Sequence, residues 1–203
     1  NNVAQENINV INGVSDGNTK EIATALDMIV DTFEKKIAIE KPYYAYLMDF
    51  KIGDFNDDEI TKVREYAFYG KKSLTSINLP ACTSIDYSAF RECTTLTSIN
   101  LPACTIIYYG AFIECTSLTS IDLPVCTSIG SSAFDSCTAL TSIKLANTSK
   151  ICTLSNSNAF KNTPIANKAG YIYVPDELVE QYKKATNWSV YASQIKPLSA
   201  YTE

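Results

Sequence analysis

Cysteines are the most regularly spaced reactive residues in this 203-residue chain. Six of the seven recur at intervals of 11 residues, and Cys152 is out of phase with them. The six are Cys82, Cys93, Cys104, Cys115, Cys126 and Cys137. A structural zinc site needs cysteine pairs separated by about two to four residues, and this spacing offers none. The pattern therefore favours buried free thiols, which pack as small apolar side chains, over a metal or redox site.

Other residue types that carry catalysis are missing from the sequence. The chain contains no histidine, which removes Ser-His-Asp and Cys-His nucleophile arrangements and all histidine-ligated zinc sites. Its seven glycines are scattered and form neither a dinucleotide-binding nor a P-loop motif. We therefore expect no catalytic residues, no cofactor and no enzymatic activity.

One acidic segment nearly matches a calcium-binding loop. Asp54, Asn56, Asp58 and Glu65 occupy positions 1, 3, 5 and 12 of the EF-hand pattern. However, Glu59 stands where the sharp turn of that loop requires glycine. We interpret the segment as an acidic turn of the first repeat and predict no metal site.

The composition limits the kinds of partner. The net charge is −5, the sequence pI is about 4.9, and the basic residues are not clustered. Binding to nucleic acid or to an anionic membrane surface needs clustered Lys and Arg, so neither partner is expected. No apolar run approaches the roughly 18 residues that cross a bilayer. The chain begins at Asn1 without a signal peptide, a start expected of either a mature exported protein or a trimmed chain.

A 22-residue repeat dominates the sequence. Leu74, Leu96, Leu118 and Leu140 begin nearly identical blocks such as LTSINLPACTSIDYSAFRECTT. The segment before Leu74 has the same skeleton with weaker identity, and the last block regains its phase after an insertion of four residues around Ala146–Lys150. We count about five coils, which is more than the roughly three that a stacked array needs.

The blocks also indicate how a coil is built. In LTSINL the apolar residues face the interior while Thr, Ser and Asn face water, and the following proline ends the strand because it lacks an N–H group. Further apolar positions and an Ala-Phe pair point inward from the opposite wall. Coils stacked in register would place equivalent strands about 4.8 Å apart in a parallel sheet. A lone coil cannot bury its apolar face, but stacked neighbours bury it for one another.

Stacking would also place the cysteines in two columns. One column holds Cys82, Cys104 and Cys126, and the other holds the remaining three in-phase cysteines. The column spacing suits the Cα separation of a disulfide, but parallel Cβ directions do not suit its torsion of about 90°. Free thiols are therefore the prediction.

The pattern LxxIxLPxCTSIxxxAFxxCTxLTSI resembles the BspA-like, Treponema-type leucine-rich repeat of bacterial surface proteins. The resemblance covers residues 52–165, and GYIYVPDELVEQYKKATNWSVYASQIKPL is similar to the C-terminal segment that closes many such arrays. It implies an α/β repeat solenoid, a right-handed array with stacked parallel strands. It also implies secretion, display at a bacterial cell surface, and adhesion or binding to host, matrix or neighbouring-cell proteins.

An open solenoid needs a cover at each end. Residues 1–51 contain an amphipathic helical stripe from Ile22 to Phe33, preceded by a capping-box-like Asn18 and Glu21. An aromatic run that we interpret as strand follows at 43–50. This region serves either as an N-terminal cap or as a helix for oligomerisation or tethering in a larger assembly, of the surface or phage-tail kind. The sequence is compatible with both interpretations and therefore leaves the oligomeric state open.

Residues 166–203 form the predicted C-terminal cap. Tyr171–Val174 alternates as a final strand, and Pro175 begins a helix over Asp176–Ala185. The helix presents apolar residues on one face, with acids in the first turn and lysines in the last, an order that suits the helix dipole. Three large side chains are expected to complete the plug: Trp188, Tyr191 and Ile195.

Sequence variation is concentrated on the segment that returns from the strand. The block after Leu96 has apolar and aromatic residues where its neighbours are polar. An apolar, tyrosine-rich patch on a polar wall is typical of the centre of a protein interface. We therefore predict that five outward-facing residues bind a partner protein, with neutral drift at exposed sites as the alternative. They are Tyr87, Ile106, Tyr108, Tyr109 and Ile113.

Overall fold

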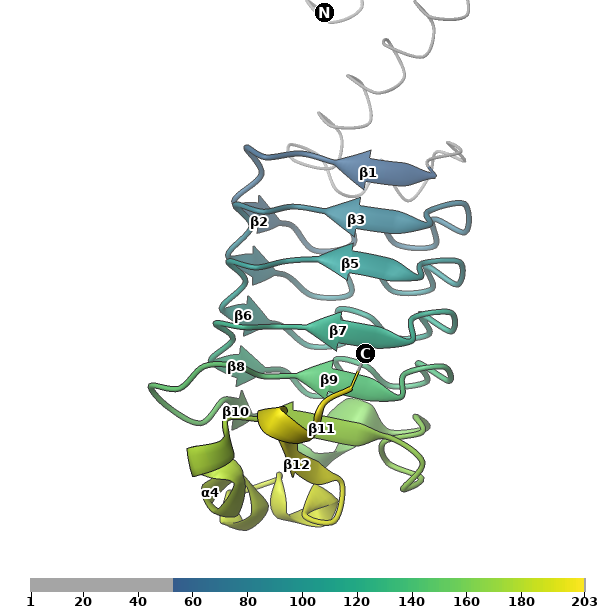
Figure 1. Ribbon diagram of the computed structural model, residues 1–203. Helices are drawn as coiled ribbons and strands as arrows, with labels where there is room; N and C mark the ends of the chain where they lie inside the picture. Colours follow the sequence, from purple (N-terminus) through teal and green to yellow (C-terminus); the bar gives the residue numbers. More distant parts are fainter. Residues whose placement is uncertain (1–52, 203) are drawn as a thin grey trace, which may run out of the picture.

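The computed structural model describes residues 53–202. The predicted N-terminal region, residues 1–51, lies outside the described residues. The described chain is a stack of coils closed at its C-terminal end by a cap of short helices and strands (Figure 1).

Two ladders of parallel strands run along the stack. The long-strand face consists of β1 (Asp54–Asn56), β3 (Ser76–Asn78), β5 (Ser98–Asn100), β7 (Ser120–Asp122), β9 (Ser142–Lys144) and β11 (Tyr171–Val174). The short-strand face consists of β2 (Lys62–Val63), β4 (Ser84–Ile85), β6 (Ile106–Ile107), β8 (Ser128–Ile129) and β10 (Thr153–Leu154). Pairing follows the repeat, with Ile77 opposite Ile99 and Ile85 opposite Ile107. The predicted parallel stacking of the coils is therefore confirmed.

The core consists of columns of identical residues, as the repeat predicts. The four repeat leucines are completely buried. Five phenylalanines stack with ring centroids 5.0 to 5.5 Å apart and planes within 9° of one another. They are Phe68, Phe90, Phe112, Phe134 and Phe160. Phe160 keeps its place in this column because the inserted residues form a loop between β9 and β10 (Figure 1).

The same insertion changes the interpretation of Cys152. In sequence this residue is out of phase, but its Sγ lies 3.8 Å from Sγ of Cys126. It therefore extends the column of Cys82, Cys104 and Cys126. The sequence spacing was misleading because the inserted residues leave the coil as a loop and do not shift the column.

All seven cysteines are buried and free, as predicted. Cys93, Cys115 and Cys137 each donate a hydrogen bond from Sγ to a phenylalanine carbonyl of the preceding coil, at 3.0 to 3.1 Å. Burial raises the pKa of Cys93 to about 12. A thiol whose pKa lies this high is protonated at neutral pH and is a poor nucleophile.

This environment predicts how the thiols react. At neutral pH the native protein should react slowly with a thiol reagent, whereas the denatured, unreduced protein should titrate close to seven thiols. Ellman's reagent, added with and without guanidinium chloride, measures both values. Because the folded pKa of Cys93 lies above the ordinary thiol pKa of 9.0, stability should be intact below pH 9.0 and fall as the pH rises toward about 12. A rapid reaction of the native protein's thiols with the reagent would contradict the burial of the two cysteine columns.

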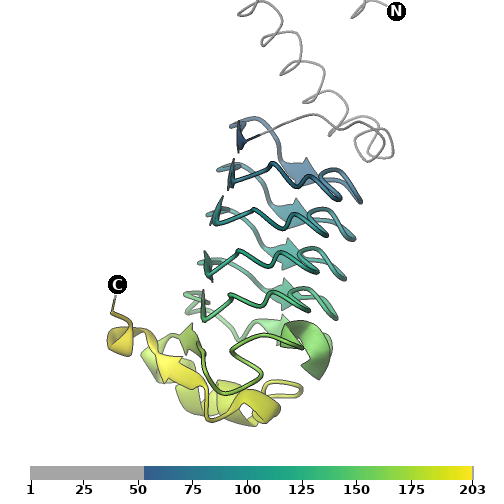
Figure 2. The same cartoon turned by 90° about the vertical axis from the view of Figure 1, so that its right-hand side faces the viewer.

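The C-terminal cap differs from the prediction in two details. The helix expected over Asp176–Ala185 begins as a 3-10 turn, η2 (Asp176–Leu178), and continues as α4 (Val179–Lys184). β11 is not the final strand, because β12 (Ile195–Pro197) pairs with it in parallel. The remaining short helices are η1 (Ser157–Phe160), η3 (Ser189–Tyr191) and η4 (Leu198–Ala200). Figure 2 shows these elements closing the end of the stack.

The ladder of the long-strand face is interrupted between β5 and β7. The strands on either side belong to separate hydrogen-bonded sheets, β1-β3-β5 and β7-β9-β11-β12, and Figure 1 shows the wider spacing between them. The side chains change at the same place. Asn100 donates from Nδ2 to Oδ1 of Asn78 at 2.7 Å, whereas Asp122, next in that column, forms an ion pair with Lys144. The short-strand face stays continuous across this level.

Candidate protein-interaction surface

The acidic segment that resembles a calcium loop is part of the first described coil. Asp54 and Asn56 lie in strand β1, so the predicted acidic turn begins only after them. The carboxylate of Asp54 accepts hydrogen bonds from the hydroxyls of Ser76 and Thr75, both at 2.7 Å, and these bonds lower its pKa. Among residues 53–202, no three Cys, Asp or Glu side chains are grouped so that they could hold a metal ion.

Three of the predicted partner-binding residues come together at one corner of the stack. Tyr87 follows β4, and Tyr108 and Tyr109 follow β6. Because β4 and β6 pair in register, the turns after them lie side by side. The rings of Tyr87 and Tyr108 are 5.4 Å apart between centroids and inclined by 37°. We call Tyr87, Tyr108, Tyr109 and the neighbouring Ile106 the tyrosine patch.

Four of the five predicted residues are exposed or half-buried, as an outward-facing side chain requires. Tyr87 and Tyr109 are 46% and 47% exposed, and Tyr108 and Ile106 are half-buried. Ile113 is buried, so the prediction that it faces outward was wrong. The reason is Gly110, because a Cβ there would lie 2.8 Å from Cδ1 of Ile113. The isoleucine folds back into the space left by the missing side chain.

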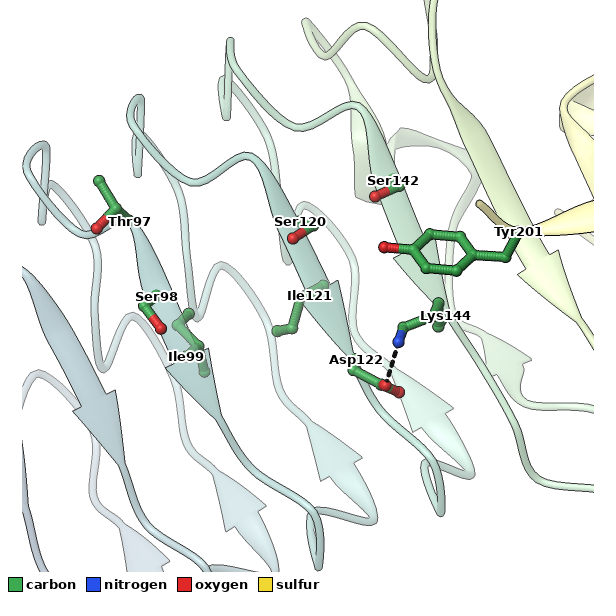
Figure 3. A pocket seen from close by; sticks show the side chains of 9 residues that line it. All are labelled: Thr97, Ser98, Ile99, Ser120, Ile121, Asp122, Ser142, Lys144 and Tyr201. Carbon is green, nitrogen blue, oxygen red and sulfur yellow. Dashed lines mark ion pairs between the residues drawn. The ribbon is translucent and has the colours of Figure 1, made fainter. Parts of the chain in front are cut away.

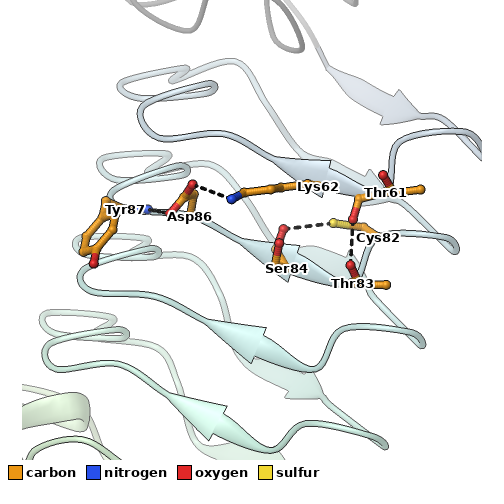
Figure 4. A network of polar contacts seen from close by, with 7 residues as sticks. All are labelled: Thr61, Lys62, Cys82, Thr83, Ser84, Asp86 and Tyr87. Carbon is orange, nitrogen blue, oxygen red and sulfur yellow. Dashed lines mark hydrogen bonds and ion pairs between the residues drawn. The ribbon is translucent and has the colours of Figure 1, made fainter.

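Two charged residues, Lys62 and Asp86, lie at the edge of the tyrosine patch. Nζ of Lys62 lies 3.1 Å from the carboxylate of Asp86 and 6.0 Å from the ring centroid of Tyr108. The same carboxylate accepts a hydrogen bond from the backbone N–H of Tyr87 at 3.1 Å. Figure 4 shows the contacts of Asp86 with Lys62 and with the backbone of Tyr87, and the ring of Tyr87 projecting from the turn. Contacts with the neighbouring coil thus help to fix the positions of Tyr87 and Tyr108.

A glycine in the next coil lets the backbone of the tyrosine patch approach closely. A Cβ on Gly130 would lie 2.6 Å from backbone atoms of Tyr108 and Tyr109. The residue between the tyrosines and the next turn, Gly110, has φ +61°, a left-handed conformation that glycine adopts without cost. The sequence shows both glycines, but their close contacts depend on the stacking distance.

Comparison with known proteins assigns the repeat to a family. A model of the BspA type leucine rich repeat region matches residues 61–184 in six copies, one more than the about five coils predicted from the spacing. The chain belongs to this family. No curated protein matches it. Leucine-rich-repeat solenoids typically present extended protein-binding surfaces.

Several solved structures resemble this chain. A T. pallidum leucine rich repeat protein is 31% identical and aligns over 57% of this chain and 51% of its own, with a TM-score of 0.48. The pneumococcal vaccine antigen PcpA is 15% identical with a TM-score of 0.52, and a Bacteroides ovatus leucine-rich repeat protein is 20% identical with a TM-score of 0.51. Each of these two aligns over 72% of this chain and 40% of its own. The chain thus spans about half or less of their length.

No helix within residues 53–202 has both the length and the apolar composition needed to cross a bilayer.

Proposed function

We propose that this chain is a non-catalytic protein-interaction module, displayed at a bacterial surface, that binds a host, matrix or neighbouring-cell protein through the tyrosine patch. The observation that carries the proposal is the placement of Tyr87, Tyr108 and Tyr109 at one corner with two of the rings nearly half exposed. Surface display is inferred from the family, whose members include bacterial surface proteins.

The chemistry of the patch suits a protein partner. Tyrosine combines a large apolar ring with a hydroxyl and has few rotatable bonds, so it gains contact area at low entropic cost. Half-exposed rings that already contact one another lose little further freedom on binding. Lys62 and Asp86 at the edge supply charges of both signs for a polar rim.

The rest of the short-strand face makes a poorer binding centre. At the level of Ile106, the equivalent positions in the neighbouring coils are Ser84 and Ser128. Small hydroxyl side chains are well hydrated and contribute little as interface hot spots. The repeat therefore departs from a uniform polar surface in the coil that begins at Leu96.

A triple substitution tests this proposal. Tyr87→Ala, Tyr108→Ala and Tyr109→Ala together should weaken binding at least about tenfold, since hot-spot aromatics each contribute more than about 1 kcal/mol. Biolayer interferometry against a panel of purified host matrix and cell-surface proteins measures the affinity. Ile113 is left unchanged because it is buried and its replacement would disturb the coil.

A matched control separates the patch from a general effect of losing a tyrosine. Tyr171→Ala removes a ring that is 43% exposed on β11, away from the patch. This variant should bind as the parent protein does, and thermal unfolding should show both variants folded. Unchanged binding by the triple variant would contradict the proposed site.

A further inference from the structure

A hollow of about 170 Å³ lies on the long-strand face where the ladder is interrupted. Figure 3 shows its side chains converging from three strands and from the C-terminal tail. It is lined by Thr97, Ser98, Ile99, Ser120, Ile121, Asp122, Ser142, Lys144 and Tyr201. The hollow lies on a different face from the tyrosine patch and does not depend on it.

The floor of the hollow contains an apolar residue that the repeat otherwise buries. Ile99 in β5 is partly exposed, whereas its column neighbours Ile77 and Ile121 are 1% and 2% exposed. The opening between β5 and β7 accounts for this difference. The interruption therefore adds an apolar spot to a face that is otherwise hydroxyl-rich.

The walls offer main-chain groups that the other coils use for ladder hydrogen bonds. Elsewhere these bonds are regular. The N–H of Leu79 donates to the backbone carbonyl of Asn100 at 3.1 Å, and the N–H of Leu123 donates to the backbone carbonyl of Lys144 at 2.9 Å. Within the described residues, the equivalent bond from Leu101 to Asp122 is not formed, and β5 and β7 belong to separate sheets. Both strand edges thus present donors and acceptors to the hollow.

An ion pair and an aromatic ring complete the site. Nζ of Lys144 lies 2.7 Å from Oδ2 of Asp122 and 4.8 Å from the ring centroid of Tyr201. The ring of Tyr173 meets that of Tyr201 edge-on, with centroids 4.9 Å apart. Tyr201 is therefore held over the sheet although it belongs to the tail after η4. In Figure 3 its hydroxyl points toward the β7 side of the hollow.

The spacing excludes an inserted peptide strand. Neighbouring strands lie about 4.8 Å apart, so a strand between β5 and β7 would need about twice that separation. Cα atoms of β5 and β7 still approach within 8 Å. The hollow accommodates a compact ligand rather than an extended backbone.

We propose that this hollow binds one sugar ring of a glycan. Each hydroxyl of a sugar both donates and accepts, and here serines, threonines and strand-edge groups do the same. Adjacent hydroxyls can donate to Asp122 and accept from Lys144, whose ion pair places acceptor and donor side by side. The apolar C–H face of the sugar packs against Tyr201 and Ile99, as apolar surfaces do in ligand sites.

Saturation-transfer-difference NMR on the full chain tests the proposal. The probes are free glucose, galactose, mannose, N-acetylglucosamine and N-acetylgalactosamine, each titrated against the parent protein. At least one should give a saturable signal, with amide shifts confined to β5, β7 and β9. Tyr201→Ala should weaken that binding about tenfold, because the loss of a stacked ring is worth about one factor of ten.

A second variant removes the charge while keeping the repeat. Asp122→Asn places in this column the residue that Asn78 and Asn100 already supply, so it should fold and still lose sugar binding. Tyr87→Ala, in the tyrosine patch, should bind sugar as the parent does. Silence from all five sugars would overturn the proposal, as would unchanged binding by Tyr201→Ala. Shifts in the hollow from a short extended peptide, with no response to sugar, would overturn it in favour of a protein ligand.

Discussion

Replacing Phe112 with alanine should lower the free energy of unfolding by about 3–5 kcal/mol, the range for truncating a buried aromatic. Phe112 is completely buried and stacks between Phe90 and Phe134, at centroid distances of 5.2 and 5.4 Å. Removal of its ring leaves a cavity and breaks two stacked pairs in the column. Urea unfolding followed by far-UV circular dichroism measures the change.

Tyr109→Ala is the matched control for this prediction. The residue lies in the same coil but is 47% exposed, so its truncation should cost less than about 0.5 kcal/mol. The chain has one tryptophan, Trp188 in the cap, and its fluorescence reports on a different part of the stack. If the stack unfolds as one unit, fluorescence and circular dichroism give the same midpoint. A loss below 1 kcal/mol for Phe112→Ala would contradict the stacked column.

The average coil was predictable because the repeat gives equivalent residues equivalent surroundings. Leu74 and Leu96 differ in position by one period, so any stacking that buries one buries the other. The same logic predicts the phenylalanine column and the burial of the in-phase cysteines. It needs only the period and the polarity of each position, and both are visible in the sequence.

Departures from the average coil were not predictable in the same way. Ile113 was expected at the surface because its counterparts Arg91 and Asp135 are polar, but its burial depends on the space beside Gly110. Cys152 was expected out of register because sequence distance does not distinguish an insertion within a coil from one in a loop. Each outcome depends on one local contact that the repeat pattern does not contain.

The interruption between β5 and β7 belongs to the same class. Asp122 differs from Asn100 by one functional group, yet the asparagine ladder ends there and the carboxylate pairs with Lys144. Asp122 and Lys144 are visible in the sequence as departures from the asparagine column. Tyr201, however, lies about 80 residues after Asp122 in the chain. Its position over the hollow depends on the folding of the tail. The tyrosine patch was easier to predict because its members come from two consecutive coils.

On the short-strand face, the cap closes the stack by replacing ladder hydrogen bonds with side-chain hydrogen bonds. Next to β10, the N–H of Cys152 donates to the hydroxyl of Tyr182 at 2.8 Å. Nε1 of Trp188 donates to the carbonyl of Cys152 at 2.7 Å. Nδ2 of Asn187 donates to the carbonyl of Leu154, also at 2.8 Å. The open edge of the last short strand is thereby covered, which protects it from pairing with another chain.

Trp188→Ala should therefore destabilise the protein by about 3–5 kcal/mol, the range for a large buried aromatic. The ring is 1% exposed and lies 6.1 Å from that of Phe160, the last member of the column. Trp188→Phe keeps most of this packing but leaves the carbonyl of Cys152 without its donor, so it should cost about 1–3 kcal/mol. Because both variants lack the fluorophore, urea unfolding is followed by circular dichroism.

The exposed neighbour Val190 provides the control. Its side chain is 61% exposed, and Val190→Ala should change stability by less than about 0.5 kcal/mol. In a solenoid each coil is stabilised mainly by its neighbours, so loss of the cap should loosen the last coil first. Hydrogen exchange should then rise at β10 and β9 before it rises at β4. Equal costs for Trp188→Ala and Val190→Ala would show that the column ends at Phe160 and that the cap adds no stability to it.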